Sequence, residues 1–217
     1  TFSVLDPEVS SALPPRQVAN GVVDAFVHTV EQYLTYPVSA FVQDGFAETL
    51  LRTLIELGPK ALETPDDYDT RANLMWTATM ALNGLIGAGV PQDWATHMIG
   101  HEITALNDTD HARTLAIVLP SLLNDQRVPK REKLLQYARN VWGIVDGGEE
   151  DRIDAAIEAT REFFQRMGIK TQLRDYGIAE PEIDQIVTGL QEHGMTALGE
   201  YGVIAPEDAR RILEAAL

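Results

Sequence analysis

Residues 21–30 read GVVDAFVHTV, and this stretch decides the fold class because its pattern is that of a helix buried on every side. Asp24 and His28 lie four residues apart and therefore share one helix face. Nearly all other faces of this helix carry apolar side chains, namely Val22, Val23, Phe26, Val27 and Val30. Inside a core, a carboxylate and an imidazole are costly unless they pair or bind a cation. The stretch predicts either a satisfied Asp–His pair or part of a metal site.

Helical patterns continue along the whole chain, and no stretch makes a convincing strand. We read Thr64 as a helix cap, and Gly58-Pro59 and Pro120 as helix stops. The expected helices span residues 14–33, 40–57, 64–85, 92–106, 111–119, 129–143, 150–167, 181–193 and 206–216. The sequence therefore predicts an all-α fold, a single helical domain over residues 1–217 with about nine helices.

Composition excludes several classes of function. The chain has 217 residues, no cysteine and a formal net charge of −16, so disulfides, thiolate nucleophiles and cysteine-zinc sites are excluded. Nucleic acid and anionic membranes prefer basic surfaces and are poor partners. No membrane-spanning stretch or signal peptide is visible, so a cytoplasmic location is expected. The chain starts at Thr1, and its opening reads like mid-chain sequence, which predicts a truncated chain or a proteolytic fragment.

A second stretch, DWATHMIGHE at residues 93–102, places His97 and His101 four residues apart on one helix face. His111 follows at a predicted helix start, where the helix dipole favours the neutral ring that a metal needs. Together with Asp24 and His28, these residues make a plausible nitrogen–oxygen site for zinc, iron(II) or another divalent ion. The fifth histidine, His193, precedes a glycine at a helix end, and we interpret it as structural.

These residues together resemble the iron-type (group III) alcohol dehydrogenase family, in its butanol dehydrogenase and NADPH-dependent aldehyde reductase branch. The second stretch, with LAIVLP at 115–120 after it, is most similar to that branch. The likeness continues through KLLQYAR at 133–139, RIDAAI at 152–157 and APEDARRILEAA at 205–216, so it covers essentially the whole chain. The family's first motif is matched, with its spacing, by Asp6, Pro14, Ala19, Gly21, Asp24, Ala25, Phe26 and Glu31.

The resemblance implies a fold, an activity and a site. The fold would be the helical C-terminal half of a dehydroquinate synthase-like dehydrogenase, acting on small aldehydes and primary alcohols as a homodimer. The implied metal ligands for one Fe²⁺ or Zn²⁺ ion are Asp24, His28, His97 and His111. The extra histidine, near the nicotinamide, is matched by His101, a candidate proton relay or a packing group. Trp94 can wall the pocket or lie in the core, and Ala112 stands where many members have glycine.

The resemblance also implies a second half. Family members begin with an α/β nucleotide-binding domain, and this chain has no Gly-x-Gly-x-x-Gly, P-loop or βαβ pattern. NADP, or NAD, would be bound mainly by that missing domain, so the isolated chain is expected to be inactive. Two alternatives stay open. A metal-dependent phosphohydrolase of the HD type needs a His-Asp doublet, here reversed as Asp110-His111. In a non-catalytic helical domain, the histidines would lie in the core with their hydrogen bonds satisfied.

Overall fold

The computed structural model describes residues 2–217 and is helical throughout that range. Nine α-helices and two short 3-10 segments occur there, and one isolated bridge joins Leu198 to Ile204. The predicted all-α class with about nine helices is confirmed. The elements are η1 (Pro7–Ser10), α1 (Pro15–Tyr33), α2 (Phe41–Glu63), α3 (Tyr68–Leu82), α4 (Ala95–Asn107), α5 (His111–Asp125), α6 (Arg131–Asn140), α7 (Glu149–Arg166), η2 (Leu173–Tyr176), α8 (Glu180–Glu192) and α9 (Pro206–Glu214).

The predicted stop at Gly58-Pro59 is wrong, because α2 runs through both residues to Glu63. Gly58 allows close packing: a Cβ there would lie 2.8 Å from the Cγ1 atom of Val22. Pro59 lacks the N–H that would bond to the carbonyl of Ile55. The guanidinium of Arg166 donates to that carbonyl instead, at 3.4 Å.

Two other helix boundaries also differ from the predicted ones. The Thr64 hydroxyl donates to the carbonyl of Lys60 at 2.9 Å, so Thr64 ends α2 and α3 begins only at Tyr68. The predicted stop at Pro120 is wrong too, since α5 continues to Asp125. Beyond Pro120, Leu122 and Leu123 are 1% exposed, and their burial offsets the hydrogen bond that proline removes.

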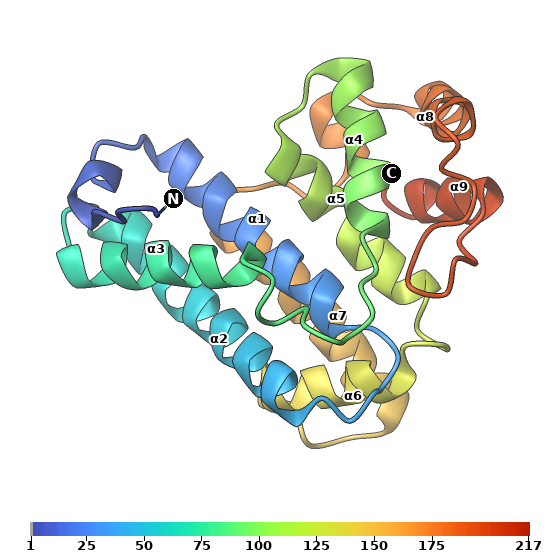
Figure 1. Cartoon of the computed structure of the whole chain (residues 1–217). Coiled ribbons are helices and arrows are strands. Elements are labelled where there is room, and N and C mark those ends of the chain that lie inside the picture. The colour runs from blue at the N-terminus through green and yellow to red at the C-terminus, as the bar shows by residue number, and fades with distance from the viewer. Residues whose placement is uncertain (1) are drawn as a thin grey trace.

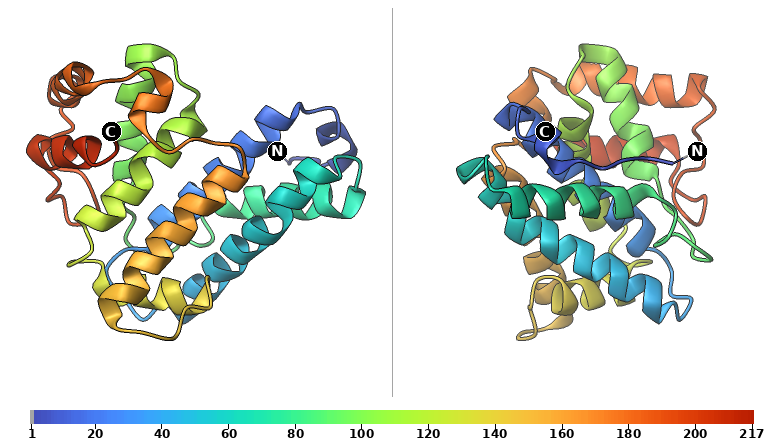
Figure 2. Two further views of the ribbon diagram at one scale, coloured as in Figure 1. Left: turned by 180° about the vertical axis from the view of Figure 1, so that it is seen from behind. Right: turned by 60° about the vertical axis from the view of Figure 1, so that its left-hand side comes forward.

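The hydrophobic interior consists of two clusters that share α5. We call the cluster built mainly from α1, α2, α6 and α7 the first core. The second core is built mainly from α4, α8 and α9. One face of α5, with Leu115 and Leu119, belongs to the first core, while Ile117 and Val118 belong to the second. Figure 1 shows α2 and α3 on one side of α1, and α4, α8 and α9 on the other. The view from behind shows α7 crossing in front of α1, so α7 covers the rear of α1 (Figure 2).

The burial of α1 agrees with its sequence pattern. Val23, Phe26 and Val27 are 0% exposed, and the Phe26 ring packs against Phe163 at a centroid distance of 5.1 Å. No helix in residues 2–217 combines the length and apolar character needed to cross a membrane.

Two glycines of α2 should respond in opposite ways to the same substitution. We expect Gly45→Ala to raise the free energy of unfolding by about 0.5–1 kcal/mol, since its Cβ meets nothing within 4 Å and alanine favours helix. Gly58→Ala should lower it by about 1–3 kcal/mol, because its Cβ overlaps Val22. Urea denaturation measures both. Equal shifts of the same sign would contradict the packing role of Gly58.

Candidate metal centre

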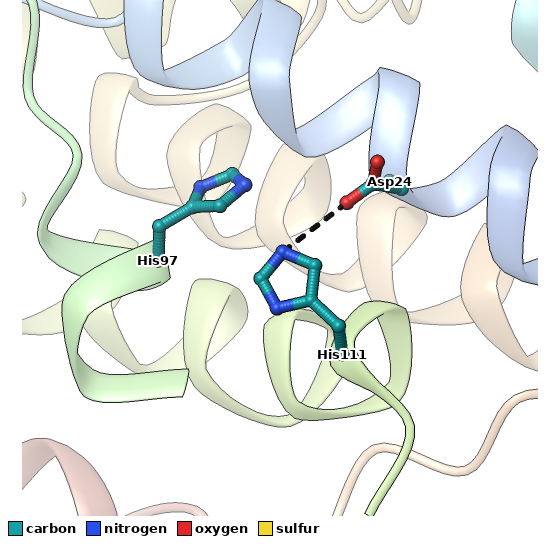
Figure 3. A group of neighbouring side chains, drawn as sticks. All are labelled: Asp24, His97 and His111. Carbon is teal, nitrogen blue, oxygen red and sulfur yellow. Dashed lines mark ion pairs between the residues drawn. The ribbon is translucent and has the colours of Figure 1, made fainter. Parts of the chain in front are cut away.

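Three side chains from three helices converge where the two cores meet. Asp24 comes from α1, His97 from α4, and His111 is the first residue of α5. One oxygen or nitrogen atom from each lies within 4.8 Å of the others. The Nε2 atom of His111 is 3.5 Å from Oδ1 of Asp24 (Figure 3). This spacing places the candidate ligand atoms around one small volume.

His28 lies beside this cluster but is not one of the three converging residues. Its ring centroid is 4.4 Å from that of His97. Its Nδ1 atom is 2.9 Å from the backbone carbonyl of Asp24 and 3.3 Å from Oδ2 of the same residue. With Nδ1 engaged, Nε2 is the ring atom left for a metal, and a carbonyl behind the ring is the usual support of a metal-bound histidine.

Two atoms of the cluster are buried without a hydrogen-bond partner, Oδ1 of Asp24 and Nε2 of His97. Buried polar atoms are normally paired, so two orphaned atoms in one cluster need an explanation. One atom is a carboxylate oxygen and the other an imidazole nitrogen, and both donor types suit a first-row divalent ion. The side chains present therefore fit a metal ion at this place.

Glu31 is the functional residue whose role the sequence did not predict. The residue is 2% exposed, and its Oε1 atom accepts from the N–H groups of Thr96 at 2.7 Å and His97 at 3.3 Å. Its Oε2 pairs with Nδ1 of His97. A carboxylate that accepts the Nδ1 proton leaves Nε2 free as a metal ligand. The signal was present as a glutamate three residues after His28 in an otherwise buried helix.

Protonation of the rings follows their surroundings. Burial, together with the positive potential from His28, lowers the pKa of His97 to about 4. Burial also lowers the pKa values of His101 and His111. For His28 burial acts in the same direction, but the hydrogen bond and charge of Asp24 outweigh it and raise the pKa. His97, His101 and His111 are thus neutral at pH 7, the form a metal ligand requires.

The start of α5, which carries His111, is tied to α1. The guanidinium of Arg16 donates to both carboxylate oxygens of Asp110, at 2.6 and 2.8 Å. The amide of Asn20 donates to the same carboxylate at 2.9 Å. The hydrogen bond and charge of Arg16 lower the pKa of Asp110, so the anchor is ionised at neutral pH. These contacts fix the position of His111 relative to Asp24.

Trp94 and His101 lie at the edge of the cluster. The Trp94 backbone is left-handed with φ 64°, which places the start of α4 at Ala95 rather than the predicted residue 92. Its ring is half-buried, with centroid distances of 5.8 Å to His28 and 5.4 Å to His97. The His101 ring is exposed and stacks on His111 at 5.0 Å. Both side chains are therefore more exposed than His97 and lie at the edge of the cluster nearer to solvent.

His193 lies outside the cluster. It is the C-cap residue of α8, and its Nδ1 atom is 2.7 Å from Oε1 of Glu102. The contact joins α8 to α4, which agrees with the structural role predicted for this histidine.

Comparison with known proteins identifies the family. Residues 18–217 match the Fe-containing alcohol dehydrogenase family, C-terminal, and the chain belongs to this family. It is 64% identical over 215 residues to the NADPH-dependent aldehyde reductase YqhD of Escherichia coli, covering 99% of this chain and 56% of that protein. It is 38% identical over 218 residues to the NADH-dependent butanol dehydrogenase A of Clostridium acetobutylicum, covering 98% of this chain and 54% of the relative.

Solved structures agree with this assignment. The substrate- and cofactor-free form of the E. coli aldehyde reductase YqhD superposes with a TM-score of 0.99 at 63% identity, covering 100% of this chain and 57% of that one. The NADH-dependent butanol dehydrogenase A of Thermotoga maritima gives a TM-score of 0.90 at 34% identity, covering 97% and 55%. The chain therefore spans little more than half the length of these relatives.

Replacing Glu31 should weaken the metal centre. The Glu31 carboxylate accepts hydrogen bonds from two backbone N–H groups and from the His97 ring. In Glu31→Gln, the NH₂ group would face at least one of these donors, so the His97 ring loses its fixed orientation. We expect Zn²⁺ affinity to fall about 10- to 100-fold, the usual effect of removing a group that supports a ligand. A competition titration with a chromogenic chelator measures it.

The matched control is Glu48→Gln, at a glutamate that is 9% exposed and bonds to Tyr33, Gln136 and Asn140, away from the cluster. It should leave Zn²⁺ affinity unchanged. An equal loss in both variants would rule out a specific role for Glu31.

Proposed function

We propose that this chain is the metal- and substrate-binding half of a dehydrogenase that interconverts aldehydes and primary alcohols with NAD(P)H. The observation that carries the proposal is the convergence of Asp24, His97 and His111, with two of their buried atoms left without a hydrogen-bond partner. Family membership supports the reaction class, because the relatives named above are an aldehyde reductase and a butanol dehydrogenase.

The proposed ligands for one Fe²⁺ or Zn²⁺ ion are Asp24, His28, His97 and His111. A bound divalent ion would supply Lewis acidity that polarises a carbonyl oxygen. The helices contribute by holding neutral rings and one carboxylate in place, with Glu31 behind His97 and Asp110 before His111. A bound ion would displace the proton from His28, so one carboxylate and three neutral rings would leave the site with a net positive charge. That charge suits an oxygen that gains negative charge during reduction.

The hydride would come from a reduced nicotinamide, for which we propose NADPH because the 64% identical relative uses it. The relatives are nearly twice as long as this chain, and we propose that the nucleotide is bound mainly by an N-terminal half that precedes it. His101 would face that nicotinamide. Its exposed ring, stacked on His111, is placed to relay a proton to the product oxygen. Trp94 would form one wall of the substrate pocket.

The two alternative functions lack support in the geometry. A non-catalytic domain with satisfied core histidines does not account for the partnerless atoms of Asp24 and His97. A phosphohydrolase needs cations free to receive phosphate, but Arg16 and Arg113 are both paired with Asp110. We therefore retain the dehydrogenase assignment.

Removal of single rings tests the ligand assignment. His97→Ala and His111→Ala should each abolish stoichiometric Zn²⁺ or Fe²⁺ binding, as measured by calorimetry and by metal analysis after dialysis. His193→Ala is the matched control and should bind metal like the unchanged chain, because its ring contacts Glu102 instead of the cluster. Normal metal content in both ligand variants would refute the assignment.

Substitution of His101 tests the proton relay. In the whole protein, His101→Ala should retain its metal and lower kcat for aldehyde reduction by about 100-fold or more, the usual contribution of a general acid. Added imidazole should restore part of the rate, because a small base can replace a missing relay but not a missing packing contact. A kcat near that of the unchanged enzyme would assign His101 a packing role.

A further inference from the structure

The cluster around Lys130 contains three buried charged side chains outside the metal centre. Lys130 is 2% exposed and stands at the N-cap of α6. Its Nζ atom lies 2.8 Å from Oδ2 of Asp93, and 2.7 and 2.8 Å from the two carboxylate oxygens of Glu200. It also donates to the backbone carbonyl of Leu34 at 2.6 Å. One ammonium group therefore contacts three segments that are remote in the sequence.

Each of these segments leads to a different part of the fold. Leu34 is the C-cap residue of α1, the helix that carries Asp24. Glu200 lies in the loop closed by the bridge between Leu198 and Ile204, and both bridge residues pack in the second core. Asp93 immediately precedes Trp94 and α4. Lys130 thus joins the end of α1 to the beginning of α4.

The contact with Asp93 reaches the metal centre through a short path. The Oδ1 atom of Asp93 accepts from the N–H of Ala95, the first residue of α4, at 2.9 Å. The N–H of Asp93 donates to the carbonyl of Glu31 at 2.9 Å. Because Glu31 also accepts from the N–H of His97, this turn is fixed at both ends against α1.

We propose that Lys130 is a positioning residue for the metal centre: it holds the first turn of α4 against α1, so that Nε2 of His97 faces Oδ1 of Asp24. Without the ammonium group, the carboxylates of Asp93 and Glu200 would be two buried like charges with no cation between them, and they would move apart. Asp93 would then no longer hold the N–H of Ala95, and His97 would lose its alignment. The proposal rests on the metal site inferred above.

Lys133, in the first turn of the same helix, offers a matched control. It is 4% exposed, its Nζ atom is 2.7 Å from Oδ2 of Asp44, and it lies over the Tyr33 ring at 4.1 Å. These partners belong to α1 and α2, and within residues 2–217 neither makes a hydrogen bond or ion pair with α4. Lys133 is therefore a lysine of similar burial that lacks the path to His97.

The experiment compares Lys130→Met and Lys133→Met in the whole protein. Both should lower the urea midpoint, because each leaves a carboxylate without its cation. Lys130→Met should in addition weaken Zn²⁺ binding about 10- to 100-fold in a chelator competition titration. It should also speed hydrogen exchange at Ala95, Thr96 and His97 in the metal-free protein. Lys133→Met should change neither Zn²⁺ affinity nor exchange at these three amides.

A folded Lys130→Met protein with unchanged affinity and unchanged exchange would overturn the proposal, and so would equal losses in the two variants. If Lys130→Met does not fold, Asp93→Asn tests the same path, because it removes the charge that Lys130 holds in place while the side chain keeps an oxygen that can accept a hydrogen bond. It should shift affinity and exchange in the same direction, and unchanged values in both would overturn the proposal. Failure of the unchanged protein to bind Zn²⁺ would instead count against the proposed function, and the exchange data would still test Lys130.

Discussion

The Glu31 carboxylate, buried between α1 and α4, is the interaction on which the arrangement of the site depends. It accepts from the backbone of Thr96 and His97 and pairs with the His97 ring, so it fixes both the helix and the side chain. Burial, with the nearby charge of Asp93, raises the pKa of Glu31 well above its usual value, and the two N–H groups oppose that shift. A single proton shared with the ring then leaves the opposite nitrogen directed at Asp24.

Charged contacts outside the metal cluster fix the beginnings of α4 and α5, the two helices that carry His97 and His111. Asp110 is bound to Arg16 and Asn20, which sets the start of α5. Lys130 and Asp93 set the start of α4 in the same manner. His97 and His111 therefore both stand in the first turn of a helix whose beginning is tied to α1 by polar groups. Helix beginnings are where unpaired N–H groups can be bound by a carboxylate, and in this chain such contacts orient the proposed ligands.

Much of this could be predicted from residue spacing, and the rest depended on tertiary contacts. The buried character of α1, the Asp24–His28 pair and the helix start at His111 follow from local patterns, and all are observed. The proline at 59 does not end its helix, because Arg166 from α7 bonds to the carbonyl that the proline leaves free. The role of Glu31 depends on α4 lying opposite it. No spacing within α1 contains that information.

The position of α5 between the two cores has a consequence for unfolding. Its Leu115 side packs in the first core and its Ile117 side in the second, and all of these side chains are fully buried. Detaching either core from α5 would expose apolar surface on the helix that the other core needs in place. The two halves of the interior are therefore thermodynamically linked, and the chain should melt as one cooperative unit despite having two centres of packing.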